Sequence, residues 1–161
     1  MSAGKETVIL AYDGSAAARE AIIAAAKLLK GCRVVVVTVW EEGLAYMPPL
    51  AAPSEGMLMT PPVNPEVAHE VDVGLHREAE QVASKGAEMA GSLGLEAEPL
   101  SLPDARNIAV TLIDLAREQR AAAIVVGSRG LGGIRARLEG STSKALLAHA
   151  PCPVLVVHAT E

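Results

Sequence analysis

Aromatic residues are nearly absent from this 161-residue sequence. They make up 2% of it, as Trp40, Tyr12 and Tyr46 without any phenylalanine. A hydrophobic core therefore has to be built from aliphatic side chains and alanine, and half of all residues are hydrophobic. Because proteins that bind single-stranded nucleic acid stack the bases on aromatic side chains, we do not expect that activity here.

Positive charge, cysteine and long apolar runs are also scarce. The 14 Lys and Arg residues are outnumbered by 19 Asp and Glu residues, giving a net charge of −5, which disfavours nucleic acid as a partner. Cys32 and Cys152 are too few for a disulfide framework. No apolar run approaches the ~18 residues of a membrane span, and Met1 to Glu6 is too polar for a secretory signal. We expect a cytoplasmic protein, with residues 1–161 forming a single domain.

Apolar, β-branched runs alternate with helix-forming segments along the chain. Strands are predicted at Thr7–Tyr12, Arg33–Trp40, Leu95–Leu102, Ala121–Val126 and Pro153–His158, and helices at Ala16–Lys30, Asp72–Leu93, Ile108–Arg120 and Ser141–His149. The nearly continuous valines of Arg33–Trp40 indicate burial on both faces, as in a parallel sheet, whereas the charges in Leu95–Leu102 indicate an edge. The pattern predicts an α/β fold, a three-layer sandwich around a five-stranded parallel sheet of order 3-2-1-4-5.

The segment Gly43–Val71 differs from the rest of the chain. It holds six of the ten prolines and three of the five methionines, and it shows no clear hydrophobic period. We predict one long loop. Loops beyond about 15 residues in compact domains are usually functional or mobile. This segment could therefore be a lid or a dimer contact, and the sequence leaves both roles open.

Two polar segments are expected to meet at one edge of the sheet. Ligands of such folds bind at the carboxyl ends of the strands, where the strand order reverses, here between the first and fourth strands. The first strand ends at Asp13, and the fourth runs into Gly127–Gly133, which holds four glycines in seven residues. Glycines let backbone N–H groups approach an anion, and Gly140–Ser143 opens a helix whose N-terminus is a natural anion site. A di- or triphosphate suits these donors.

The other end of this crevice suits a nucleoside. Asp13 can accept hydrogen bonds from a ribose or a base, and the backbone at Val39 can read an adenine edge within an apolar slot. The motifs of two large nucleotide-binding classes are missing, since the sequence has no G-x-x-x-x-G-K-[ST] and no G-x-G-x-x-G after the first strand. A P-loop NTPase and a common dinucleotide-binding domain are therefore excluded.

The spacing of the glycines is more informative than their number. Gly127 and Gly130, followed after nine residues by Gly140-Ser141, fit the pattern G-x2-G-x9-G-[ST]. With Asp13-Gly14-Ser15 after the first strand and Ala150-Pro151-Cys152-Pro153 before the last, the sequence resembles the universal stress protein family, in its ATP-binding branch. The resemblance covers nearly the whole chain outside Gly43–Val71. It implies the Rossmann-like fold of the adenine nucleotide alpha hydrolases.

The resemblance also implies a ligand and a set of residues that hold it. The ligand would be ATP, or AMP or ADP, with Mg²⁺ bridging the phosphates. The nucleotide-binding residues would be Ala11, Asp13, Val39, Val126, Gly127, Ser128, Arg129, Gly130, Gly140, Ser141, Thr142 and Ser143. A homodimer would form through the last strand, Pro153–His158. The sequence departs from many relatives at Arg129, where they carry histidine, and this departure bears on any ATP hydrolysis.

The leading functional hypothesis is an ATP-binding, nucleotide-responsive stress or signalling module. Three alternatives stay open: a slow ATP hydrolase, for which we find no general base, a flavodoxin-like electron carrier, and a dimeric scaffold without a ligand. Asp13 can instead be a turn residue or helix cap, and Ser141 and Thr142 can simply cap a helix. His69 and His76 have no third ligand nearby for a metal site.

Overall fold

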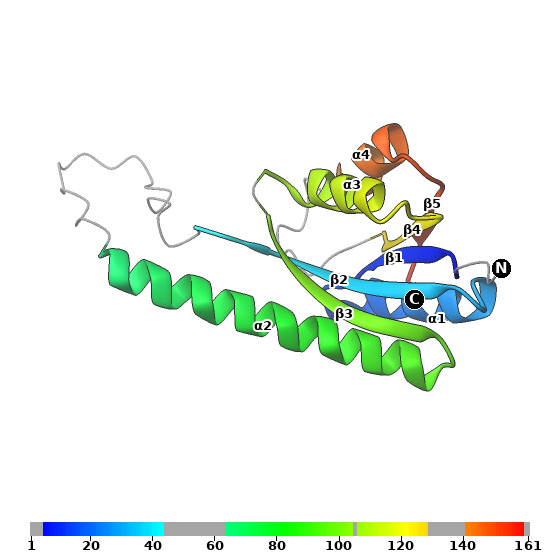
Figure 1. The fold of residues 1–161 in the computed structure, drawn as a ribbon, viewed down its shortest axis with the longest axis horizontal. Coiled ribbons are helices and arrows are strands. Elements are labelled where there is room, and N and C mark those ends of the chain that lie inside the picture. Colours follow the sequence, from blue (N-terminus) through cyan, green and yellow to red (C-terminus); the bar gives the residue numbers. More distant parts are fainter. Residues whose placement is uncertain (1–4, 44–63, 105, 129–140, 160–161) are drawn as a thin grey trace.

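The computed structural model describes residues 5–43, 64–104, 106–128 and 141–159 (Figure 1). In chain order the elements are β1 (Thr7–Ala11), α1 (Ala16–Leu28), β2 (Arg33–Glu41), α2 (Pro65–Ser92), β3 (Glu96–Asp104), α3 (Ile108–Glu118), β4 (Ala123–Gly127), α4 (Ser141–His149) and β5 (Val154–Val157). The five strands are parallel and lie in the order β3-β2-β1-β4-β5. The predicted fold class and strand order are confirmed.

Alternate residues of each strand enter two separate cores. Val8, Val34 and Val125 face α1 and α2, whereas Ile9 and Ile124 face α3 and α4. Successive strand side chains point to opposite faces of a sheet, and here a layer of helices covers each face (Figure 1). This arrangement explains the unbroken valine run of β2, because both faces of that strand are buried and neither face needs polar residues.

Helix α2 begins earlier than we predicted, and this corrects the loop assigned to Gly43–Val71. The helix starts at Pro65, so residues 65–71 are helical rather than loop. Asn64 is the N-cap, and its side-chain oxygen accepts a hydrogen bond from the backbone N–H of Glu66 at 3.0 Å. Proline is favoured in the first turn because its missing N–H is not needed there. The rest of the predicted loop, 44–63, lies outside the described residues.

The two edge strands of the sheet differ. Strand β3 pairs with β2 without a break from Glu96 to Asp104 although it contains Pro99 and Pro103. Proline has no N–H to donate, so an unbroken ladder means that both prolines turn their nitrogens to the open edge. Strand β5 has no proline between Val154 and Val157. Its outer edge therefore keeps its backbone donors.

The described helices include none that could cross a membrane, since none is both long and apolar enough.

Candidate functional site

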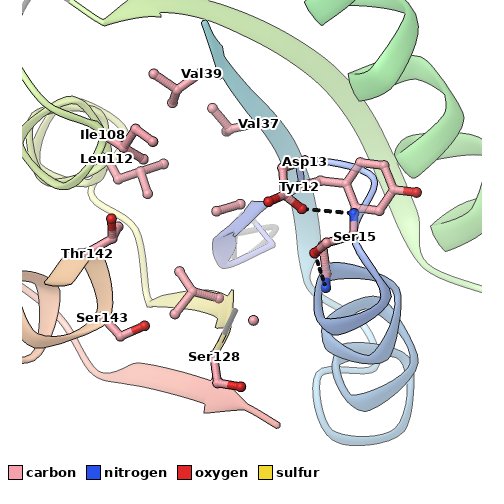
Figure 2. Close-up of a pocket in the computed structure, with 14 residues that line it drawn as sticks. Tyr12, Asp13, Ser15, Val37, Val39, Ile108, Leu112, Ser128, Thr142 and Ser143 are labelled. Carbon is pink, nitrogen blue, oxygen red and sulfur yellow. Dashed lines mark hydrogen bonds between the residues drawn. The ribbon is translucent and has the colours of Figure 1, made fainter. Parts of the chain in front are cut away.

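A pocket opens at the carboxyl edge of the sheet, where β1 and β4 lie side by side and the strand order reverses (Figure 2). Residues from three strands, three helices and the turns that join them line it. They are Ala11, Tyr12, Asp13, Ser15, Ala18, Val37, Val39, Ile108, Leu112, Val126, Gly127, Ser128, Thr142 and Ser143. The pocket therefore lies where the rule for doubly wound sheets puts a ligand.

Asp13 is held in the turn between β1 and α1. Its Oδ1 atom accepts a hydrogen bond from the backbone N–H of Ser15 at 2.9 Å, and Ser15 Oγ accepts one from the N–H of Ala18 at 3.1 Å. Ser15 is thus the N-cap of α1, and Asp13 in turn orients the cap (Figure 2). The positive φ of Gly14, 79°, lets the chain turn sharply between the two residues.

One wall of the pocket is an apolar slot. Val37 and Val39 of β2 form one side, and Ile108 and Leu112 of the first turns of α3 form the other (Figure 2). Leu112 is fully buried, but Ile108 is 40% exposed at the start of its helix. An isoleucine left open beside a buried leucine offers a ligand apolar surface to cover. The slot suits a flat group with apolar faces, such as a nucleobase.

The opposite wall is polar. Ser128 follows β4, and Thr142 and Ser143 lie in the first turn of α4 (Figure 2). Helices α1, α3 and α4 all begin at this pocket, with residues of their first turns among its lining. Backbone N–H groups and the partial positive charge of a helix N-terminus favour an anion. The polar wall therefore suits phosphate.

Charge is sparse in the part of the pocket that the structure describes. Among the described lining residues, Asp13 alone is charged. Arg19 of α1 lies close by, and its Nη1 donates a hydrogen bond to the carbonyl oxygen of Gly14 at 2.9 Å. Arg135 and Arg137, like Arg129, lie outside the described residues.

Gly127, the first glycine of the motif, has a packing role. A Cβ atom built there would lie 2.7 Å from the carbonyl carbon of Ala17 and 2.9 Å from its oxygen. These distances are shorter than real Cβ atoms allow, and the contacted atoms belong to the backbone of α1. The end of β4 and the start of α1 can therefore lie this close only because residue 127 is glycine.

Eight of the twelve predicted nucleotide-binding residues line the pocket: Ala11, Asp13, Val39, Val126, Gly127, Ser128, Thr142 and Ser143. Ser141 begins α4, and Arg129, Gly130 and Gly140 lie outside the described residues. The prediction missed Tyr12, Ser15, Ala18, Val37, Ile108 and Leu112. Ile108 and Leu112 could have been predicted from the sequence, because they lie on the apolar face of a helix that starts at the carboxyl edge of the sheet.

The histidines and cysteines take no part in this pocket. The described residues hold no group of three His, Cys, Asp or Glu side chains that could bind a metal. Cys32 and Cys152 are free, half-buried and packed against the two cores. Burial raises the pKa of the Cys152 thiol, which disfavours the reactive thiolate. This packing makes both cysteines part of the hydrophobic cores.

The fold and the pocket define a doubly wound α/β protein with a pocket where the strand order reverses, and sequence comparison gives its family. The model of the universal stress protein family matches residues 5–158. A universal stress protein from Thermus aquaticus, encoded in the 3′ region of a QAH/OAS sulfhydrylase gene, is 31% identical over 154 residues, which are 94% of this chain and 98% of the relative. The chain belongs to the universal stress protein family.

Solved structures share the fold. Hypothetical protein MJ0577 superposes with a TM-score of 0.74 at 18% identity, over 97% of each chain. A universal stress protein in complex with cAMP has a TM-score of 0.61 at 20% identity, over 97% of this chain and 98% of that one. One from Archaeoglobus fulgidus in complex with dAMP has a TM-score of 0.60 at 23% identity, over 95% and 97%.

Proposed function

We propose that the pocket binds an adenine nucleotide, with ATP as the ligand, and that the protein acts in the cytoplasm as a nucleotide-responsive stress or signalling module. The observation that carries the proposal is the pairing of an apolar slot with a polar wall of hydroxyls and helix N-termini in one pocket. Relatives of the same fold bind cAMP and dAMP, which supports an adenine nucleotide as the class of ligand.

In this proposal the base lies between β2 and α3. Val37, Val39, Ile108 and Leu112 contact its faces, and the polypeptide backbone near Ala11 and Val39 hydrogen-bonds to its edge. Asp13 accepts hydrogen bonds from the ribose hydroxyls. Since none of these groups contacts a phosphate, they serve AMP, ADP and ATP alike.

The phosphates extend toward Ser128, Thr142 and Ser143 and the glycine motif that joins β4 to α4. Ser143 is 8% exposed, so a phosphate oxygen there would be shielded from water, and each hydrogen bond to it would gain strength. A longer phosphate chain uses more of this wall. We therefore expect ATP to bind more tightly than AMP.

Mg²⁺ would be bound mainly through the nucleotide. The described residues offer no cluster of three carboxylate, thiolate or imidazole groups for it, whereas Ser128 and Thr142 supply hydroxyls beside the phosphate wall. Mg²⁺ commonly keeps several waters and is held by substrate phosphates with few protein ligands. When bound, the ion would neutralise phosphate charge in a pocket whose described lining has no cation.

The test is calorimetric titration of the purified protein with Mg-ATP, after release of any copurified nucleotide. Ile108→Asp places a carboxylate at the open side of the slot, and we expect it to weaken ATP binding at least about tenfold because the charge would be buried by the base. Val73→Asp is the matched control, since Val73 is also 40% exposed but lies on α2 away from the pocket. Equal binding by both variants, or no binding by the wild type, would refute the proposal.

We also propose a homodimer formed through the outer edge of β5, because that edge keeps the backbone donors that β3 has lost at its prolines. Strand addition at such an edge satisfies donors that otherwise face water.

A further inference from the structure

Tyr12, the residue between β1 and Asp13, is held by groups from β2. Its backbone N–H donates to the carbonyl oxygen of Val37 at 2.8 Å, and its carbonyl oxygen accepts from Thr38 Oγ1 at 2.8 Å. Tyr12 and Thr38 are each 7% exposed, so little water reaches this hydrogen bond. The main chain on the N-terminal side of Asp13 is therefore fixed by one backbone and one side-chain hydrogen bond.

The ring of Tyr12 points away from the pocket and packs against α2 (Figure 2). A Cβ atom at Gly86 of α2 would lie 2.6 Å from Cδ1 and 2.9 Å from Cγ of this ring, and 2.9 Å from Cγ1 of Val36. Cγ lies on the axis about which the ring rotates, so a rotation of the ring about its Cβ–Cγ bond cannot relieve that contact. The Tyr12 ring occupies its place because residue 86 has no side chain.

Other glycines of the same helix lack this contact. A Cβ atom at Gly74 or Gly91 would meet nothing within 4 Å. Position 86 therefore differs from positions 74 and 91, because only there does the close approach of Tyr12 and Val36 exclude the methyl group that alanine would add.

We infer that Gly86 and Thr38 are positioning residues for the nucleotide site. They act on Asp13 through Tyr12, Gly86 by admitting the ring and Thr38 by binding the carbonyl oxygen. Asp13 is the next residue, and its Oδ1 accepts the Ser15 N–H at 2.9 Å, so a shift of Tyr12 moves the carboxylate and strains that hydrogen bond. The inference rests on the proposed function for its effect on binding, but its effect on the Asp13 turn is independent of any ligand.

The experiment compares Gly86→Ala with the matched control Gly74→Ala in the full-length protein. The ligand-free readout is amide hydrogen exchange at Ser15, the donor to Asp13. We expect exchange at Ser15 to accelerate at least about tenfold in Gly86→Ala, as for the loss of a hydrogen bond, while the amides of Leu10 and Ile22 in the core keep their rates. The second readout is the Kd for Mg-ATP, which we expect to rise about tenfold.

The outcomes separate the two claims. If the wild type binds no nucleotide but Ser15 exchange responds to Gly86→Ala as expected, the proposed function fails and the positioning role stands. If Ser15 exchange matches that of the wild type, or if the core amides accelerate in parallel with Ser15, the positioning role is refuted whatever the Kd.

A second pair of variants covers the case in which Gly86→Ala does not fold. Thr38→Val removes the hydroxyl that binds the Tyr12 carbonyl and nearly keeps the side-chain shape, whereas Thr38→Ser keeps the hydroxyl. We expect Thr38→Val to show the same faster Ser15 exchange and weaker ATP binding as Gly86→Ala. We expect Thr38→Ser to keep the exchange rate and the ATP affinity of the wild type. Identical behaviour of the two variants would refute the inference.

Discussion

At the scale of single residues, Gly127 shows that one residue can satisfy two requirements. It is the first glycine of the motif whose spacing predicts phosphate binding, and it also lies where any Cβ atom would collide with the backbone of Ala17. The second requirement is visible in the fold without a ligand. Loss of nucleotide binding after substitution of Gly127 would therefore say little about phosphate contacts.

The packing role of Gly127 leads to a stability prediction. Gly127→Ala should lower the free energy of unfolding by about 1–3 kcal/mol, because the added methyl group must push α1 away from β4. Gly74→Ala should leave it unchanged or raise it by up to about 1 kcal/mol, since its Cβ enters open space in a helix. Urea denaturation followed by circular dichroism measures both, and equal effects would contradict the packing role.

Asp13 and Ser15 illustrate what a local pattern leaves open. The sequence Asp-Gly-Ser left Asp13 with three possible roles, as a nucleotide ligand, a turn residue or a helix cap. The structure makes Ser15 the cap and Asp13 the acceptor for the Ser15 N–H. The role of Asp13 as a ribose ligand stays a prediction, compatible with the cap because the same turn lines the pocket.

At the scale of elements, most segments were predicted from local sequence. Helix α4 was predicted with its observed bounds, and each strand to within about two residues. The error at α2 came from treating all prolines of Gly43–Val71 as loop signals, although Asn64-Pro65-Glu66 is a pattern typical of a helix start. The sequence rules for helix N-termini therefore predict a helix start here, and our prediction of a loop overlooked it.

The two sheet edges lead to a prediction about assembly. The carbonyl oxygens of Pro153 and Val157 accept hydrogen bonds from the N–H groups of Ile124 in β4 and Ser128 just after it. In a parallel ladder the N–H groups of Val154 and Val156 therefore point outward. Val156→Pro should remove an outward donor, keep the ladder to β4, and convert the proposed dimer to a monomer in sedimentation. Val156→Thr is the control that keeps the N–H. A dimer that persists in Val156→Pro, or a wild type that is monomeric, would contradict pairing through β5.

At the scale of the whole molecule, charge pairs gather at the amino edge of the sheet, opposite the pocket. Lys5 pairs with Glu96 at the start of β3, and Arg33 of β2 pairs with Glu98. The hydrogen bond and the positive charge from Lys5 lower the pKa of Glu96 below its ordinary value of 4.5. This pair links the residues before β1 to the far edge of the sheet.

The lowered pKa of Glu96 predicts how stability depends on pH. A carboxyl group with a lower pKa in the folded state stabilises the fold above its ordinary pKa of 4.5, and that contribution is lost as the pH falls through the lowered value. The urea midpoint of Glu96→Gln should therefore fall less than that of the wild type between pH 7 and about pH 3. Because the pair is exposed, 1 M salt, with a Debye length of about 3 Å, should shrink the difference. At low salt, an equal fall of the urea midpoint in Glu96→Gln and in the wild type as the pH is lowered would contradict the prediction.

The sequence by itself determined the order of strands and helices, and with it the sheet topology and the edge where Asp13 and Gly127 meet. These features follow from local periodicity, turn residues and the handedness of crossovers, which need no knowledge of distant contacts. Only the tertiary structure decided that Gly86 admits Tyr12, that Gly127 admits Ala17, and that Ile108 and Leu112 wall the pocket. Periodicity tells which face of an element is buried, but the residue opposite it across a helix–sheet interface is set by how the layers pack.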